Sequence, residues 1–105
     1  MKKETETKEG ILELLRANRD NIAAYGVRKV GLFGSFVRNE QSLESDIDLI
    51  VVFEGDKKTF DNFMNLIFFL EELLKRRVEL ITSDALSPYL GPHILKEAEY
   101  VTFSS

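Results

Sequence analysis

The chain has no cysteine and no tryptophan, and only two prolines, among its 105 residues. The absence of cysteine excludes disulfide bonds and thiolate metal sites. No run of eighteen or more apolar residues is present, and five acidic or amide side chains interrupt the most apolar segment, residues 60–74, so we expect a globular helix there and no membrane span. The polar, charged residues 1–9 lack the apolar segment of a signal peptide, so a cytoplasmic protein is expected.

Basic side chains are fewer than acidic ones. Fourteen Lys and Arg against eighteen Asp and Glu give a net charge of −4 and a pI of about 5.0. Tight binding of naked nucleic acid requires basic side chains that neutralise phosphates, so the composition disfavours that class of function. A nucleotide substrate is compatible with this charge, because a divalent cation can supply positive charge locally.

The length fits a single domain spanning residues 1–105, in which residues 1–8 are expected to be disordered. Apolar side chains spaced by three, four and seven predict an amphipathic helix over residues 9–25, with Gly26 as its C-terminal stop. A second, long helix is expected over residues 59–75, where Thr59 suits the N-cap position.

Alternating and continuous apolar runs predict three strands, at residues 27–33, 46–53 and 78–82. Shorter helical pieces are expected at residues 36–39 and 93–100. The long helix between the second and third strands suits a parallel crossover, whereas the short connection between the first two also allows an antiparallel pair. We therefore predict an α/β (α+β) fold, in which helices pack on a small mixed β-sheet.

Two aspartates, Asp46 and Asp48, lie two residues apart in the second predicted strand, so their side chains should share a face. Like charges about 4 Å apart repel by roughly 4 kcal/mol at an effective dielectric near 20. A solvated strand end or a bound cation would offset that cost, and magnesium commonly links carboxylates to substrate phosphates. Glu79, inside the apolar third strand, is the candidate third carboxylate; the alternative is an edge-strand glutamate that faces water.

A glycine-serine pair follows the first predicted strand. Gly34 allows the backbone to approach a phosphate closely, and successive N–H groups at such a turn favour anions. The Ser35 hydroxyl would donate a further hydrogen bond to a phosphate, with a simple helix N-cap as the alternative. Arg38 would contact the same phosphates or form a structural ion pair.

At these residues the sequence resembles the polymerase beta-like nucleotidyltransferase superfamily, and more closely its minimal nucleotidyltransferase (MNT) group. The matching segments are Gly34-Ser35-Phe36-Val37-Arg38-Asn39 and Ser45-Asp46-Ile47-Asp48-Leu49. The resemblance covers nearly the whole chain and implies a polymerase beta palm-like fold. It departs from the family pattern at Asn39, where glycine is usual, and at Glu79, where aspartate is commoner; asparagine tolerates a positive φ better than most residues.

The resemblance also implies roles for the candidate residues. Asp46, Asp48 and Glu79 would be the catalytic residues and the ligands of two Mg²⁺ ions, and Gly34, Ser35 and Arg38 would bind the nucleotide. Members of the group often accompany a HEPN-domain toxin, so the implied activity is transfer of AMP from ATP to a tyrosine of that toxin by an antitoxin. The alternative is a non-catalytic binding module that neutralises a helical partner by contact alone.

Overall fold

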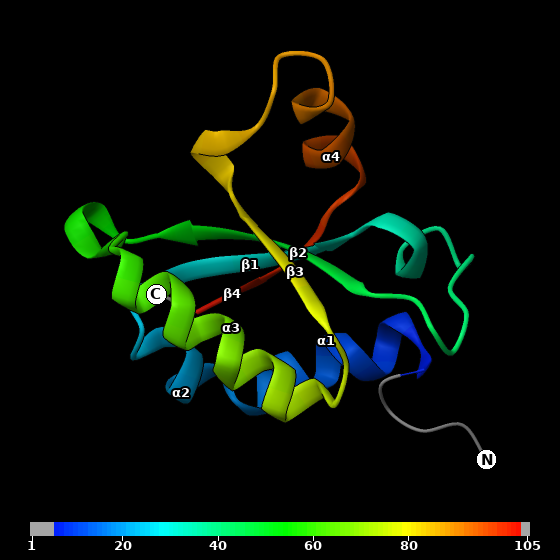
Figure 1. The fold of residues 1–105 in the computed structure, drawn as a ribbon, viewed down its shortest axis with the longest axis horizontal. Coiled ribbons are helices and arrows are strands. Elements are labelled where there is room, and N and C mark those ends of the chain that lie inside the picture. The colour runs from blue at the N-terminus through cyan, green and yellow to red at the C-terminus, as the bar shows by residue number, and fades with distance from the viewer. Residues whose placement is uncertain (1–5, 104–105) are drawn as a thin grey trace.

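The structure, a computed structural model, describes residues 6–103 and builds them from helices and strands that share one hydrophobic core (Figure 1). The helices and strands, in chain order, are α1 (Lys8–Ala17), α2 (Arg19–Ala23), β1 (Val27–Phe33), β2 (Ile47–Phe53), α3 (Phe60–Leu74), β3 (Val78–Thr82), α4 (Gly91–Glu97) and β4 (Glu99–Thr102). Single 3₁₀ turns lie at η2 (Gly34–Phe36), η3 (Gly55–Lys57) and η4 (Ser83–Ala85). None of the described helices has both the length and the apolarity needed to cross a membrane.

The four strands form one mixed sheet in the order β3-β2-β1-β4. β1 pairs antiparallel with both β2 and β4, and β2 pairs parallel with β3. The predicted α/β architecture is therefore confirmed, including the parallel crossover through α3 and the antiparallel pairing of the first two strands. Strand β4 was not predicted, and residues 99–100 were wrongly assigned to a final helix.

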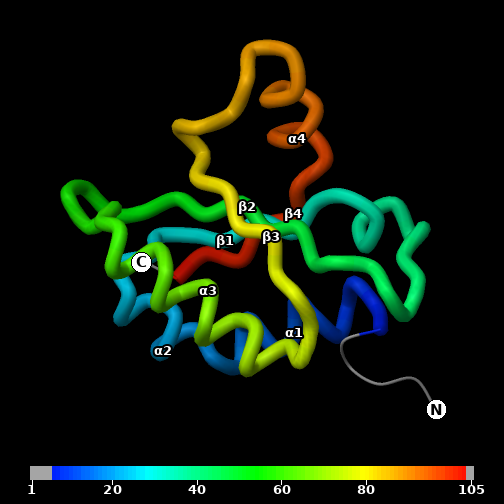
Figure 2. Tube along the Cα trace, in the orientation of Figure 1, coloured from blue at the N-terminus to red at the C-terminus, as the bar shows by residue number. Residues whose placement is uncertain are grey.

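The two faces of the sheet have different partners. Side chains of alternate positions, such as Val30, Leu49 and Leu80, are buried against α1, α2 and α3, which lie together on one side of the sheet (Figure 2). Because side chains alternate along a strand, Asp48 and Glu79 point to the other face. The segment that carries α4 lies on that second side, so the candidate acidic residues face a partly uncovered surface.

The N-terminal helix prediction needs two corrections. The helix predicted over residues 9–25 breaks at Asn18, which ends α1 and begins α2, and the Asn18 amide donates to the Leu14 carbonyl at 3.0 Å. Residues 6–8, predicted to be disordered, are placed: the Thr7 hydroxyl accepts from the Gly10 N–H at 3.0 Å, and Lys8 pairs with Glu99 at 2.8 Å. The rest of that prediction, residues 1–5, lies outside the described residues.

The boundaries near the predicted site also shift slightly. β2 begins at Ile47, so Asp46 precedes the strand in which it was predicted. The short helix predicted at residues 36–39 is a 3₁₀ turn that begins at Gly34. The Thr59 cap is confirmed, since its hydroxyl accepts from the Asn62 N–H at 3.1 Å.

Candidate active site

A cleft of about 1020 Å³ opens on the sheet face opposite α1, α2 and α3, between the strands and the segment that carries α4. Four of the six predicted site residues line this cleft: Gly34, Arg38, Asp48 and Glu79. The structure therefore brings together residues from β2, from β3 and from the turn region after β1, which are separated in the sequence. Ser35 and Asp46 lie beside these residues in the chain but do not line the cleft.

Two carboxylates lie side by side on neighbouring strands. The register of the parallel pair places Asp48 next to Glu79, and the antiparallel register places Phe33 on the other side of Asp48. Burial, then the negative charges of Glu79 and Asp46 and a hydrogen bond with Glu79, raise the pKa of Asp48 from 3.8 to about 6, although Arg38 counteracts them. Near neutral pH Asp48 is therefore ionised at a free-energy cost that a bound cation would relieve.

Gly34 is required where β1 turns into η2. Its φ is +79°, and a Cβ atom at this position would overlap the carboxylate of Asp48. L-residues rarely adopt this backbone conformation, so both the turn and the close approach of Asp48 favour glycine. The close neighbour of Gly34 in the structure is the Asp48 carboxylate, and the predicted approach of a phosphate to this glycine remains a prediction.

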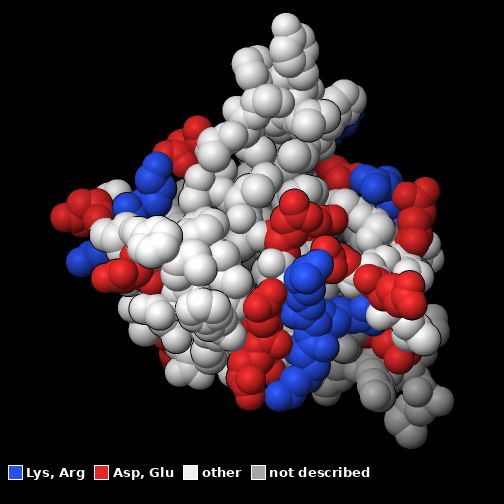
Figure 3. Space-filling model, viewed as in Figure 1, with Lys and Arg blue, Asp and Glu red and all other residues white. Residues whose placement is uncertain are grey.

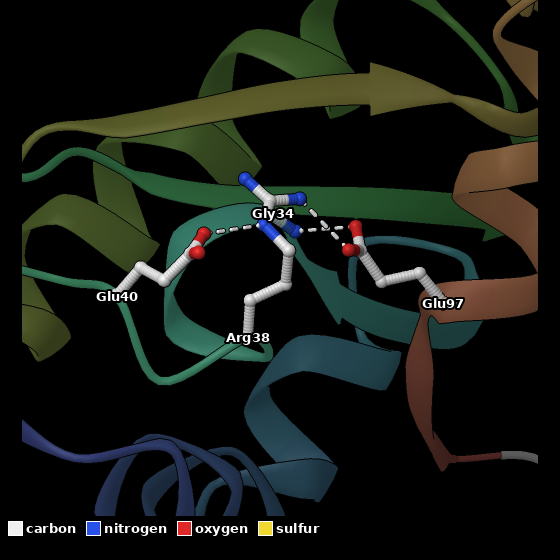
Figure 4. A network of polar contacts seen from close by, with 4 residues as sticks. All are labelled: Gly34, Arg38, Glu40 and Glu97. Atoms are coloured by element: carbon white, nitrogen blue, oxygen red, sulfur yellow. Dashed lines mark hydrogen bonds and ion pairs between the residues drawn. The ribbon is translucent and has the colours of Figure 1, made fainter.

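A network of polar contacts joins the glycine turn to the end of α4 (Figure 4). The Glu97 carboxylate accepts from the Gly34 N–H at 2.9 Å and from Arg38 Nη1 at 2.8 Å. Arg38 Nε also donates to Glu40 at 2.7 Å. Of the two roles left open for Arg38, the structure shows the ion pair.

These contacts fix the charge states of both partners. The hydrogen bonds to Glu40 and Glu97, together with the negative charge of Glu97, raise the pKa of Arg38. Burial acts to raise the pKa of Glu97, but the hydrogen bond from Gly34 and the contact with Arg38 outweigh it and hold that pKa below its ordinary value. Glu97 is therefore an anion at the position where two predicted phosphate-binding groups converge.

Sequence reasoning missed Glu97 and assigned no role to His93, which also lines the cleft. Glu97 meets Gly34 and Arg38 across 63 and 59 residues of sequence, respectively. No local sequence pattern predicts such a contact. It depends on the pairing of β4 with β1, which places the end of α4 next to Gly34.

Residues 11–101 match the family model described as the nucleotidyltransferase domain. The chain belongs to the nucleotidyltransferase family. The protein adenylyltransferase MntA of Thermococcus cleftensis is 36% identical over 96 residues, which cover 90% of this chain and 96% of that protein. This family membership gives the enzyme class of the chain, as the glycine-serine and aspartate motifs indicated.

Two solved structures resemble this nucleotidyltransferase. One, assigned to the minimal nucleotidyltransferases, has a TM-score of 0.69 and 38% identity, covering 84% of this chain and 93% of that one. The other belongs to a crystal structure of a toxin–antitoxin with AMP-PNP, with a TM-score of 0.65 and 25% identity, covering 90% of this chain and 72% of that one. The resemblance to the minimal group is confirmed.

The donor chemistry of the cleft fits the magnesium that the family implies. Asp48 and Glu79 offer carboxylate oxygens, which are the ligands that Mg²⁺ takes, and the raised pKa of Asp48 shows that positive charge would be stabilising there. Within residues 6–103, no three Asp, Glu or His side chains gather closely enough to form a ready metal site. The structure thus brings two carboxylates together, and the roles of Asp46, Asp48 and Glu79 as metal ligands remain predictions.

The loop before Asp46 is hydrogen-bonded to a residue that follows α3. Arg76, just after α3, donates from Nη1 to the carbonyls of Leu43 at 2.8 Å and Ser45 at 3.1 Å. Its guanidinium also lies 5.4 Å from the ring centroid of Phe36 in η2. Arg76 therefore fixes both the glycine-serine turn and the approach to Asp46.

Asn39 adopts a φ of 60°, a positive value of the kind that asparagine was expected to tolerate. Asn39→Val should lower the free energy of unfolding by about 1–2 kcal/mol, because a β-branched residue is strained in the left-handed region. Asn39→Gly should stay within about 0.5 kcal/mol of the parent. Urea unfolding measures both, and equal losses in the two variants would contradict this account.

Proposed function

We propose that this chain transfers AMP from ATP to a hydroxyl group of a partner protein in a magnesium-dependent reaction. The observation that carries the proposal is the meeting of the Asp48–Glu79 pair with Gly34 and Arg38 in one cleft. A carboxylate pair suits the metal, and a glycine turn with an arginine suits the phosphates. The relative from Thermococcus cleftensis, named a protein adenylyltransferase, supports AMP as the transferred group.

Each residue would act by binding or by positioning. Asp48 and Glu79, with Asp46, would hold two Mg²⁺ ions, which when bound would neutralise the triphosphate and assist the loss of pyrophosphate. The Gly34 N–H, the Ser35 hydroxyl and Arg38 would bind the β- and γ-phosphates. Glu79, whose side chain is exposed at the cleft, would orient the acceptor hydroxyl for in-line attack on the α-phosphate and take up its proton.

The acceptor would be supplied by a separate protein, which we propose to be a HEPN-type toxin modified on tyrosine in the cytoplasm. The solved toxin–antitoxin structure with AMP-PNP supports a paired system of this kind. The projection around α4, almost uncharged on the face in Figure 3, carries Tyr89, Leu90 and Leu95, which are 85%, 63% and 49% exposed. Leu90 also lines the cleft, so an apolar protein surface seated on this projection would lie beside the reacting groups.

One observation favours the rival function, a module that neutralises its partner by contact alone. Glu97 already occupies the Gly34 N–H and Arg38, so the groups proposed for phosphate binding are engaged within the chain. In a pure binding module that arrangement would be permanent. In an enzyme, the nucleotide would have to replace Glu97.

A transfer assay distinguishes the enzyme from the binding module. The chain is incubated with ATP labelled at the α-phosphate, with Mg²⁺ and with a purified HEPN-type toxin as the candidate partner. We expect label on the partner, its loss in EDTA, and its loss in the Asp46→Asn, Asp48→Asn double variant, which should remain folded by circular dichroism. If the parent transfers no label, and the double variant neutralises the partner as well as the parent does, the enzymatic proposal is wrong and the binding module is correct.

A further inference from the structure

The Glu97 carboxylate accepts hydrogen bonds from two groups that are suited to binding an anion, a backbone N–H and a guanidinium. One carboxylate oxygen accepts from the Gly34 N–H at 2.9 Å and the other accepts from Arg38 Nη1 at 2.8 Å. Charge-assisted contacts of this length are those that a phosphate group makes with a backbone amide and a guanidinium. Figure 4 shows the carboxylate directed at both donors from the end of α4.

The position of Glu97 is otherwise unfavourable. It is the last residue of α4, where the carbonyl ends of the helix carry partial negative charge that repels a carboxylate. Its side chain is only 22% exposed, so burial further disfavours the charge. Gly34 and Arg38, with a smaller contribution from His93, compensate for these costs, and all three line the cleft that contains Asp48.

We propose that the Glu97 carboxylate occupies the place of a triphosphate phosphate group, and that a bound nucleoside triphosphate displaces it from Gly34 and Arg38. This rests on the proposed function in one respect, because it assumes that these two groups bind the nucleotide. Glu97 is then an internal competitor of the substrate. It keeps the glycine turn and the guanidinium in position while the cleft is empty, and it lowers the apparent affinity for the triphosphate.

Two further variants distinguish the displacement of Glu97 from the simple loss of a negative charge near Arg38. Glu40 also pairs with Arg38, at 2.7 Å, but does not contact Gly34. Glu40→Gln therefore removes one negative charge from the same guanidinium and leaves the Gly34 N–H occupied. Glu97→Asp keeps the charge but shortens the side chain by one methylene, so it cannot span both donors from the same backbone position.

The test is the equilibrium binding of α,β-methylene-ATP with MgCl₂, whose α–β bridge resists cleavage. Glu97→Gln and Glu97→Asp should each bind about five- to tenfold more tightly than the parent, since each frees a charged hydrogen-bonding site. Glu40→Gln should gain about twofold or less. In parallel, the amide resonance of Gly34 should move when the analogue is added to the parent.

The outcomes separate failure of this inference from failure of the function. If the parent and all variants fail to bind the analogue, the proposed function is wrong. If the parent binds but neither Glu97 variant binds more tightly than Glu40→Gln, Glu97 is not a competitor and the inference alone is overturned. Weaker binding by folded Glu97→Asp and Glu97→Gln would show that Glu97 supports the nucleotide site, which also overturns it.

Discussion

Replacing Asp48 by asparagine is expected to reduce nucleotidyl transfer by at least about a thousandfold. Asp48 is the half-buried member of the carboxylate pair, beside Glu79 on the next strand, and an amide cannot supply the negative oxygen ligand that Mg²⁺ requires. Label transfer from ATP to the partner at saturating Mg²⁺ measures the loss. A folded Asp48→Asn variant that keeps a tenth or more of the parent activity would exclude Asp48 from the reaction.

The same substitution should stabilise the metal-free protein. Burial and the neighbouring negative charges raise the pKa of Asp48 to about 6, above its ordinary 3.8. The folded state therefore binds this proton more tightly than the unfolded state does, and the stability that the proton confers is present below about pH 4 and is lost as pH rises through 6. At pH 7.5 in EDTA, Asp48→Asn should gain about 1 kcal/mol, a value reduced for partial exposure.

Thermal unfolding provides the measurement. The gain corresponds to a Tm increase of about 4–8 °C for a domain of this size, and it should shrink when the pH is lowered to 4, where Asp48 itself is largely protonated. Glu54→Gln, at an exposed position just after β2 and outside the helices, is the matched control and should leave Tm unchanged. A decrease of Tm for Asp48→Asn in EDTA at pH 7.5 would contradict the proposed electrostatic cost.

Gly34→Ala is expected to reduce both the activity and the stability of the protein strongly. It places a side chain at a φ of +79° and against the Asp48 carboxylate. Transfer should fall by about a hundredfold or more, since displacement of reacting groups by about 1 Å has effects of this size. The free energy of unfolding should fall by about 2–4 kcal/mol, combining backbone strain with the steric clash.

Gly55→Ala distinguishes the cost of backbone strain from the cost of a steric clash. Gly55 also has a positive φ, +38°, but nothing lies within 4 Å of where its Cβ would be. It should therefore lose only about 1 kcal/mol in urea unfolding and keep its activity. In an Asp48→Ala background, Gly34→Ala should cost less stability than in the parent, and an unchanged cost would show that the clash with Asp48 is not the cause.

The parts of the fold that local patterns determine were predictable. β1 and β3 match their predicted ranges because their apolar runs end at turn residues, and α3 follows from its apolar spacing and the Thr59 cap. The confirmed positive φ of Asn39 belongs to the same class, since it depends on one residue and its turn. Such features are encoded within a few consecutive residues.

The missed features depend on contacts between distant residues. β4 is a four-residue edge strand, and only its pairing with β1 makes residues 99–102 extended. Propensity within residues 93–100 gave no reason to end a helix at Glu97. The contact of Glu97 with Gly34 follows from that pairing, so a sequence reading that missed the strand could not find it.

The candidate site shows the same division. The motifs selected Gly34, Arg38, Asp48 and Glu79 because their residue types and spacing suit phosphate and magnesium chemistry, and all four line the cleft. The motifs did not show that Asp46 precedes β2, or that Arg38 is engaged by two carboxylates. The structure thus places four of the six residues in one cleft, and the roles of all six remain predictions.

The edge position of β4 has a mechanical consequence for the cleft. One wall of the cleft, α4, is attached to the sheet through a strand that pairs with β1 alone, and the Lys8–Glu99 ion pair ties that strand to α1. Short edge elements open at a smaller free-energy cost than central ones. We therefore expect the wall to open at a smaller free-energy cost than the β3-β2-β1 part of the sheet, which carries the two carboxylates.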